Sequence, residues 1–274
     1  MKILEFLKVI LFGIVEGYTE FLPISSTGHL ILLENLVHLD QPEDFFNVFK
    51  VVIQLGAILS VVVLYWDRLW PFTRTKNATE RQNILNLWVK IIIACVPGAV
   101  IGFFLDDIVD DKLSTPVVIA ITLILYGVAF ILLEKFQGKK HFPIQSTKQL
   151  TYKTALLIGF FQCLALIPGT SRSGATILGA MLFGVSRAAG AEFSFFLGIP
   201  MMCGASFLKI VKHGLSFTGS QWVILILGTA VSFVVALLSI RYLMNYIRRH
   251  DFSVFGLYRI GLGIVVLVYF FAIA

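Results

Sequence analysis

Charged residues are scarce in this chain of 274 residues. They make up 14% of the sequence, while hydrophobic residues make up 58% and the mean hydropathy is +0.88. A soluble domain averages about 25% charged residues. The scarcity of charge therefore excludes a soluble protein and indicates an integral membrane protein. Because the apolar runs extend from end to end, we expect a single integral membrane domain that covers residues 1–274.

Cysteine is also rare, and the common catalytic signatures are missing. The three cysteines lie in apolar surroundings without the spacing of metal ligands, so no disulfide framework or structural metal site is indicated. The sequence contains no P-loop, no GxSxG elbow and no HExxH helix. This excludes the enzyme classes that depend on those motifs.

The net charge of +6 comes mainly from the segments that connect the apolar runs. Basic residues gather in three segments: 67–87, 135–153 and 241–251. Segments 38–48 and 106–112 are acidic. Basic loops of membrane proteins tend to lie in the cytoplasm. This distribution accounts for the charge without a nucleic-acid partner, and it predicts that the acidic loops and both termini lie outside.

Six apolar segments are long enough to cross a bilayer, which takes roughly 20 residues. They cover about 45–66, 87–105, 116–134, 188–211, 220–241 and 253–273. Four shorter pieces flank two turns rich in proline, serine, threonine and glycine. They cover 3–15, 28–37, 154–167 and 174–185. Irregular backbone at membrane depth must be satisfied by protein or water. We therefore predict an all-α polytopic membrane protein with six transmembrane helices and two re-entrant helix–loop–helix hairpins.

The two hairpins are copies of one pattern. Five aligned pairs correspond: Gly13 and Gly159, Glu16 and Gln162, Ser25 and Ser171, Thr27 and Ser173, and Gly28 and Gly174. Each half has one hairpin and three spans, with repeat 1 at about 1–140 and repeat 2 at about 150–274. An odd number of crossings inverts the second copy, as in transporter-like inverted repeats. We expect the two polar turns to meet near the middle of the bilayer.

Glu16 and Glu20 are four residues apart in the first hairpin, so they share one helical face. Their oxygens suit a hard divalent cation, Mg²⁺ or Ca²⁺. Alternatively, one carboxylate is a base and the other orients it, or both are interfacial carboxylates without a ligand. Two carboxylates at membrane depth repel one another, so one should be protonated when no cation is bound.

The first turn supplies further candidates. Ser25, Ser26 and Thr27 can cap the following helix, and capping alone would explain one or two of these hydroxyls. His29 lies at the start of that helix, where the helix dipole disfavours a protonated imidazole. It should be neutral near pH 7 and able to accept a proton. The alternative is a histidine held by a packing hydrogen bond.

The second turn has the composition of an anion-binding site. Small residues and successive backbone N–H groups surround Arg172 at a helix start, and a planar guanidinium suits phosphate. The candidate substrate-binding residues of both turns are Ser25, Thr27, Ser171, Arg172, Ser173, Gly174 and Thr176. The alternative is that Arg172 snorkels or caps a neighbouring helix. Elsewhere, Arg187 and Glu192 could pair with one another, and Tyr258 and Arg259 look like interfacial anchors.

The two motifs resemble those of a known family. Residues 16–29, EGYTEFLPISSTGH, and 168–176, PGTSRSGAT, resemble the two signatures of the undecaprenyl pyrophosphate phosphatase family, known also for bacitracin resistance. The similarity extends through the whole chain. It implies hydrolysis of a lipid-linked pyrophosphate to the monophosphate and inorganic phosphate, which recycles the carrier lipid for cell-wall synthesis. It also implies a divalent cation, and a site open to the outer face of the bacterial cytoplasmic membrane.

On this interpretation the catalytic candidates are Glu20, Ser26, His29 and Arg172, and the candidate cation ligands are Glu16 and Glu20. The nucleophile is Ser26 with His29 as base, which we favour, or a water activated by His29, or His29 itself. Membrane lipid surrounds the polyprenyl tail, and the sequence predicts no oligomeric state. The rival interpretation is a transporter, because inverted repeats with broken helices are common among carriers. A carrier, however, has no use for two carboxylates that face the same phosphate.

Overall fold

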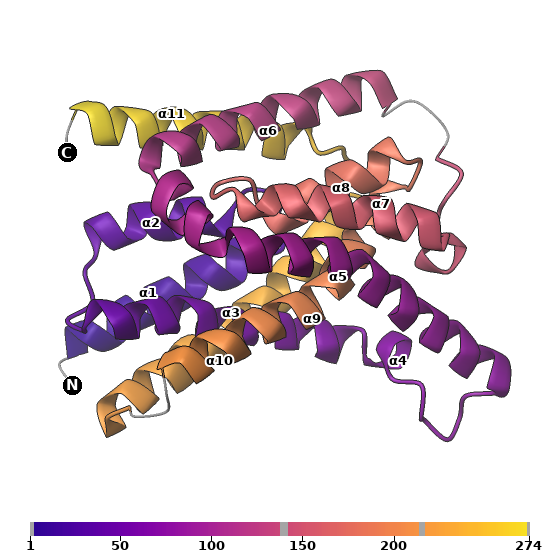
Figure 1. Cartoon of the computed structure of the whole chain (residues 1–274), viewed down its shortest axis with the longest axis horizontal. Helices are drawn as coiled ribbons and strands as arrows, with labels where there is room; N and C mark the ends of the chain where they lie inside the picture. Colours follow the sequence, from indigo (N-terminus) through magenta and orange to yellow (C-terminus); the bar gives the residue numbers. More distant parts are fainter. Residues whose placement is uncertain (1–2, 138–141, 214–216, 273–274) are drawn as a thin grey trace.

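The computed structural model describes residues 3–137, 142–213 and 217–272. Over these ranges the regular structure is helical, apart from one isolated bridge between Ile144 and Val185. In chain order (Figure 1) the helices are α1 (Ile3–Thr19), α2 (Ser26–Leu36), α3 (Glu43–Leu64), α4 (Trp66–Leu69), α5 (Ala78–Leu113), α6 (Pro116–Gln137), η1 (Thr147–Gln149), α7 (Tyr152–Cys163), η2 (Leu164–Leu166), α8 (Arg172–Leu182), α9 (Arg187–His213), α10 (Gly219–Tyr246) and α11 (Ser253–Ala272).

Six helices are long and apolar enough to cross a membrane: α3, α5, α6, α9, α10 and α11. Each of them overlaps one of the six predicted spans, so the all-α polytopic fold is confirmed. The four remaining longer helices form two helix–turn–helix hairpins, α1–α2 and α7–α8, at the predicted places. Re-entrance of these hairpins into a bilayer remains a prediction.

The start of α5 differs from the prediction. The helix begins at Ala78, well before the predicted span at 87. The Asn77 side chain accepts a hydrogen bond from the N–H of Glu80 at 2.8 Å, and the Glu80 carboxylate accepts one from the N–H of Asn77 at 2.9 Å. This capping box satisfies donors at the helix start. The predicted boundary was wrong because hydropathy alone assigns such a polar first turn to a loop.

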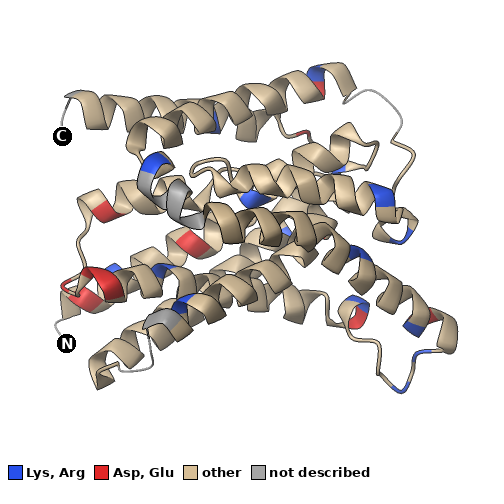
Figure 2. Cartoon of the chain, in the orientation of Figure 1, with Lys and Arg blue, Asp and Glu red and all other residues tan. Residues whose placement is uncertain are grey.

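The two ends of the bundle differ in charge (Figure 2). At one end, Lys8 Nζ donates to the carbonyl of His38 at 2.6 Å and the N–H of Asp40 donates to Glu5 at 3.2 Å, which ties the start of α1 to the α2–α3 connection. Acidic residues are frequent there, and Lys and Arg are frequent at the opposite end (Figure 2). The predicted acidic segment 106–112 cannot be added to this pattern, because most of its side chains lie outside the described residues.

The helices pack in two equivalent sets. Helices α1 and α3 pack against α10, α7 and α9 pack against α5, and α6 runs along α11 (Figure 1). A Cβ added at Gly13 of α1 would lie 2.9 Å from the Gly228 carbonyl oxygen of α10. At Gly159 of α7 it would lie 2.3 Å from the Ala94 carbonyl oxygen of α5. Aligned glycines therefore allow the same close helix approach in both halves, as expected for two copies of one unit.

Candidate active site

The two turns begin their second helices in the same unusual way. Ser25 and Ser171 both have φ of 71°, and they are the non-glycine residues with positive φ among those described. The hydroxyl of Ser25 accepts from the N–H of Gly28 at 3.3 Å, and that of Ser171 accepts from the N–H of Gly174 at 3.1 Å. Positive φ is unfavourable for a residue with a side chain, and such strain gathers at functional sites. Both predicted substrate-binding serines therefore act as N-caps here.

The turns contact one another through Ser173 and Arg172. Ser173 is fully buried, and its hydroxyl lies 3.2 Å from the Glu20 carbonyl oxygen and 3.3 Å from that of Leu22. Arg172 Nη2 donates to Glu20 Oε1 at 3.3 Å, and Nη1 donates to the Ser194 carbonyl at 2.7 Å. The structure thus joins the arginine of one hairpin to a carboxylate of the other.

Ser26 completes this group. Its hydroxyl donates to Glu20 Oε2 at 2.7 Å, and both residues are 8% exposed. Glu20 therefore holds a hydroxyl with one oxygen and a guanidinium with the other. A carboxylate that accepts a hydrogen bond from a hydroxyl is placed to remove its proton. This geometry gives Ser26 a partner different from the predicted one, His29.

Glu16 lies beside Glu20 and is fully buried, and apart from Glu20 neither of its carboxylate oxygens has a hydrogen-bond partner among the described residues. Two ionised carboxylates are both acceptors, so a proton or a cation must lie between them. The part of the chain that is described holds no group of three or more His, Cys, Asp or Glu suited to a metal. A cation here would have two carboxylates and complete its shell with substrate or water, a set that suits Mg²⁺.

His29 has partners different from those of Glu20 and Ser26. Its Nδ1 is 2.7 Å from the Ser25 carbonyl oxygen, and its Nε2 is 2.7 Å from the Tyr258 hydroxyl. The carbonyl can only accept, so Nδ1 carries the proton and a neutral ring accepts at Nε2 from Tyr258. The two rings also stack, with centroids 5.6 Å apart. The lone pair of His29 is thus occupied by Tyr258, a residue expected from its sequence to anchor at the membrane interface.

Two predicted substrate-binding residues lie outside the contact between the turns. Thr27 is exposed on the first turn of α2. Thr176 is fully buried, and its hydroxyl donates to the Ser194 hydroxyl at 2.7 Å, which joins α8 to α9. The roles assigned to these residues, and to the remaining candidates, stay predictions. The geometry favours Thr176 as a packing residue.

Two other expectations about charged residues were wrong. Arg187 and Glu192 do not pair with each other within the described structure: Arg187 forms an ion pair with Glu134, and Glu192 forms one with Arg68. Arg259 is not an interfacial anchor, because it is fully buried and binds backbone carbonyls of both turns. A lone arginine inside the apolar run 253–273 is itself a sign of function, and this signal could have identified it.

Buried polar groups without partners gather around the two turns. Within the described ranges these groups belong to Glu16, Gln162, Thr170, Arg172 and Ser232. Ser232 packs against Gly17, which is next to Glu16 in sequence. Nearly all buried polar atoms in proteins are hydrogen-bonded, so a cluster of exceptions calls for a water or ligand. The meeting point of the hairpins is therefore the candidate ligand site.

Comparison with known proteins identifies the family. The family described as bacitracin resistance protein BacA matches residues 9–265. The chain belongs to this family. It is 53% identical over 271 residues to an undecaprenyl-diphosphatase of Enterococcus faecalis, with 98% of each chain covered. It is 53% identical over 274 residues to that of Limosilactobacillus fermentum, covering 99% of each chain. The resemblance expected from the two motifs is confirmed.

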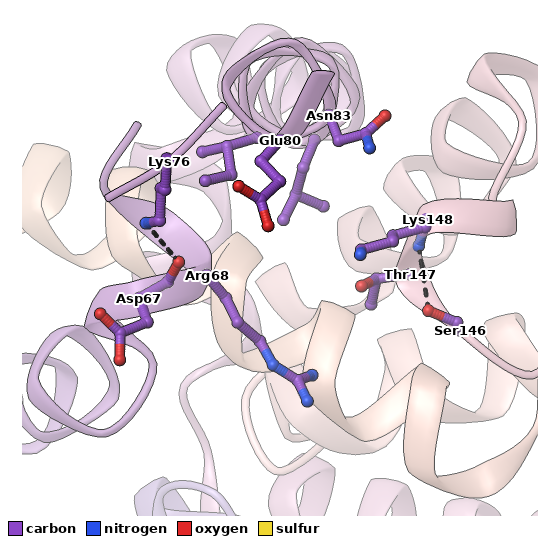
Figure 3. A pocket seen from close by; sticks show the side chains of 10 residues that line it. Asp67, Arg68, Lys76, Glu80, Asn83, Ser146, Thr147 and Lys148 are labelled. Atoms are coloured by element: carbon purple, nitrogen blue, oxygen red, sulfur yellow. Dashed lines mark hydrogen bonds between the residues drawn. The ribbon is translucent and has the colours of Figure 1, made fainter. Parts of the chain in front are cut away.

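A polar cavity of about 340 Å³ lies at the basic end of this BacA-family chain, away from the turns. Figure 3 shows the side chains of α4, the start of α5 and η1 around it. Its charged groups largely bind the protein itself: Arg68 pairs with Glu192, and Lys76 donates to the carbonyls of Asp67 and Trp70, each at 2.5 Å. None of the predicted site residues lines it.

Proposed function

We propose that this chain hydrolyses undecaprenyl pyrophosphate to undecaprenyl phosphate and inorganic phosphate at the site between the two turns. As a member of its family the chain is a membrane phosphatase. One observation carries the location: Glu20 lies beside Glu16 and contacts Arg172, and among the described residues the buried Arg172 Nε has no partner and the buried Glu16 carboxylate has none apart from Glu20. The reaction returns the carrier lipid to cell-wall synthesis.

Binding of the pyrophosphate would use the second turn. Arg172 and the N–H groups at the start of α8 offer positive charge and donors to the phosphates. The Nε of Arg172 is buried and has no partner among the described residues, so part of the guanidinium is free to bind. The polyprenyl tail would stay between helices in the lipid. Catalysis of phosphoryl transfer then depends mostly on positioning and on charge stabilisation.

Ser26 is the nucleophile that the geometry favours. Its oxygen would attack the terminal phosphorus, its proton would pass to Glu20, and the bond to the bridging oxygen would break to release undecaprenyl phosphate. Water would then cleave the phosphoserine and release inorganic phosphate. The 2.7 Å hydrogen bond from Ser26 to Glu20 supports this order. Attack by His29 is less favoured, because its Nε2 is hydrogen-bonded to Tyr258 at 2.7 Å.

A divalent cation, Mg²⁺ or Ca²⁺, would be held by Glu16 and Glu20. The Glu16 oxygens support this assignment, because within the described ranges their partner is the second carboxylate, Glu20. The cation would neutralise phosphate charge, which lets a negatively charged substrate approach two carboxylates.

The site would open to the outer face of the cytoplasmic membrane. Basic residues gather at the end of the bundle that carries η1, and the hairpin α1–α2 enters from the opposite end (Figures 1 and 2). Basic loops favour the cytoplasm. The first hairpin, with Glu20 and Ser26, would then enter from outside.

The decisive experiment measures phosphate release by the purified protein from farnesyl pyrophosphate and undecaprenyl pyrophosphate, with and without EDTA. We expect release that EDTA abolishes and added Mg²⁺ or Ca²⁺ restores. Absence of release with any divalent metal would contradict the proposal and favour a carrier of phosphate-bearing lipid. Phosphate release that EDTA does not affect would contradict only the proposed requirement for a divalent cation.

A further inference from the structure

Arg259 of α11 connects segments that are far apart in the sequence. Its Nη1 donates to the Pro23 carbonyl of the first turn at 3.2 Å. Its Nη2 donates to the carbonyls of Gly169 and Thr170 in the second turn at 2.9 and 2.8 Å. Its Nε donates to the Leu123 carbonyl of α6 at 3.4 Å. One guanidinium therefore binds both turns and the helix beside them.

The surroundings of Arg259 differ from those of an ordinary structural arginine. It is fully buried, and none of the ion pairs found among the described residues includes it. Its guanidinium carbon lies 5.5 Å from the centroid of the Tyr126 ring. Burying a charge without a counter-ion is costly unless hydrogen bonds compensate. A neutral packing residue would avoid that cost, so its presence points to a task that only the guanidinium performs.

That task follows from where the bound carbonyls lie. Pro23 is three residues after Glu20 and three before Ser26, and Thr170 is two residues before Arg172. By binding carbonyls on both turns, Arg259 thus fixes the backbone that carries the reacting groups. The Glu20–Arg172 contact is long for a charged pair, at 3.3 Å. The Ser173 hydroxyl also joins the turns, but it can donate to only one carbonyl at a time. Arg259 adds hydrogen bonds to carbonyls of both turns.

We propose that Arg259 is a positioning residue that fixes the two turns against each other and so sets the placement of Arg172 relative to Glu20 and Ser26. Lysine cannot replace it, because an ammonium is a single point, whereas the planar fork reaches carbonyls on three segments. The expected effect of Arg259 on turnover rests on the proposed function. The tether between the turns, meaning the hydrogen bonds from Arg259 to carbonyls of both turns, does not depend on that function.

The test that is independent of activity is hydrogen–deuterium exchange on the purified full chain. In Arg259→Lys and Arg259→Met, amides of residues 20–25 and 167–174 should exchange faster by about tenfold, the order expected from losing hydrogen bonds to a charged group. The other helices should keep wild-type exchange. Exchange that rises evenly over the chain, or stays unchanged in both turns, would overturn the proposal.

A matched control is Arg187→Lys. Arg187 also binds with its planar guanidinium, in its case to the carboxylate of Glu134 at the basic end of the bundle. In Arg187→Lys, faster hydrogen–deuterium exchange should be confined to that end of the bundle. If the Arg259 variants do not fold, Tyr126→Leu removes the ring beneath the guanidinium and should raise exchange in both turns to a smaller extent. No change in either turn would then overturn the proposal.

The kinetic test separates positioning from general stability. Arg259→Lys should lower kcat by roughly 100-fold, as expected when reacting groups move by about 1 Å, and should change KM far less. When Arg259→Lys is added to Arg172→Lys, kcat should fall by less than about a further threefold, because both changes act on one contact. Losses that multiply would show that Arg259 does not act through Arg172. If the wild type releases no phosphate but the exchange result holds, the proposed function fails and the tether stands.

Discussion

Arg172 binds two partners with one guanidinium, the Glu20 carboxylate and the Ser194 carbonyl. Arg172→Lys keeps the charge but cannot reach both partners and a phosphate in one plane. We expect kcat/KM for phosphate release to fall by at least about 100-fold, the order seen when a charge-stabilising donor is removed. Arg68→Lys, at the basic end, should retain activity. Near-normal turnover of Arg172→Lys would count against phosphate binding by the Arg172 guanidinium.

Ser26 is tested by removing its hydroxyl. Ser26→Ala should abolish the phosphoserine intermediate and reduce phosphate release by at least about 100-fold, since the attacking atom is lost. Acid-quenched wild-type enzyme should carry phosphate on Ser26 by mass spectrometry. Ser60→Ala is a suitable control, because Ser60 is also buried and its hydroxyl donates to Ala57 in its own helix. Turnover by Ser26→Ala near the wild-type rate would instead indicate attack by water.

The core of the candidate site stands out in the sequence because its residues lie in two short polar turns between apolar runs. Glu16, Glu20, Ser26 and Arg172 stand out there by type and spacing alone. Their partners could not be predicted in the same way. The contact of Arg259 with Pro23 joins residues 236 positions apart, and only the packing of α11 on α6 brings them together.

At the scale of the element, the second turn depends on one glycine. Gly169 has φ of 87°, and a Cβ there would lie 2.2 Å from Thr122 Oγ1 of α6. Thr122 in turn donates to the Pro168 carbonyl at 2.8 Å. Alanine at position 169 would therefore be strained in its backbone and would push the turn away from α6.

We expect Gly169→Ala to lower both thermal stability in detergent and kcat per folded molecule. Gly184→Ala is a matched control, because Gly184 also has positive φ, at 80°, and packs against Pro143 at the basic end. It should lose stability but keep kcat. Equal kcat for the two variants would contradict a special role of the second turn in catalysis.

Helix type and number could be predicted at this scale, but helix boundaries could not be predicted reliably. Apolar length identifies the six spans because a bilayer requires it. The first turn of α5 was missed because its stability comes from the Asn77 cap and not from hydropathy. In the same way α1 extends to Thr19, past the predicted end at 15, and so carries Glu16 on its last turns.

The whole molecule uses one scaffold twice for different chemistry. Gly13 and Gly159 keep equivalent helix contacts, and Ser25 and Ser171 keep the same strained cap. The copies differ at Glu16, whose counterpart is Gln162. The two copies keep the same helix contacts and caps but differ in charge. Two turns of similar shape can therefore bring acids and a guanidinium to one place. That asymmetry is what a phosphatase needs and a symmetric carrier does not.

The inverted arrangement makes a prediction for the intact membrane. Thr79 and Ser220 are both exposed in the first turns of α5 and α10, the corresponding spans of the two halves. Opposite orientation of the halves puts these positions on opposite sides, and the positive-inside tendency puts Thr79 in the cytoplasm. Single-cysteine variants Thr79→Cys and Ser220→Cys, made after replacing Cys95, Cys163 and Cys203, can be treated with a membrane-impermeant maleimide.

In intact cells Ser220→Cys should be labelled, and Thr79→Cys should be labelled only after permeabilisation. The reverse pattern would contradict the outward-facing site, since the hairpin α1–α2 enters the bundle from the same end as the start of α10 (Figure 1). Labelling of both positions from one side would contradict inversion itself, because an odd number of crossings separates the two halves. If Ser220→Cys is labelled in intact cells, such cells should also release phosphate from substrate added outside. The reason is that the first hairpin and residue 220 share one face of the membrane.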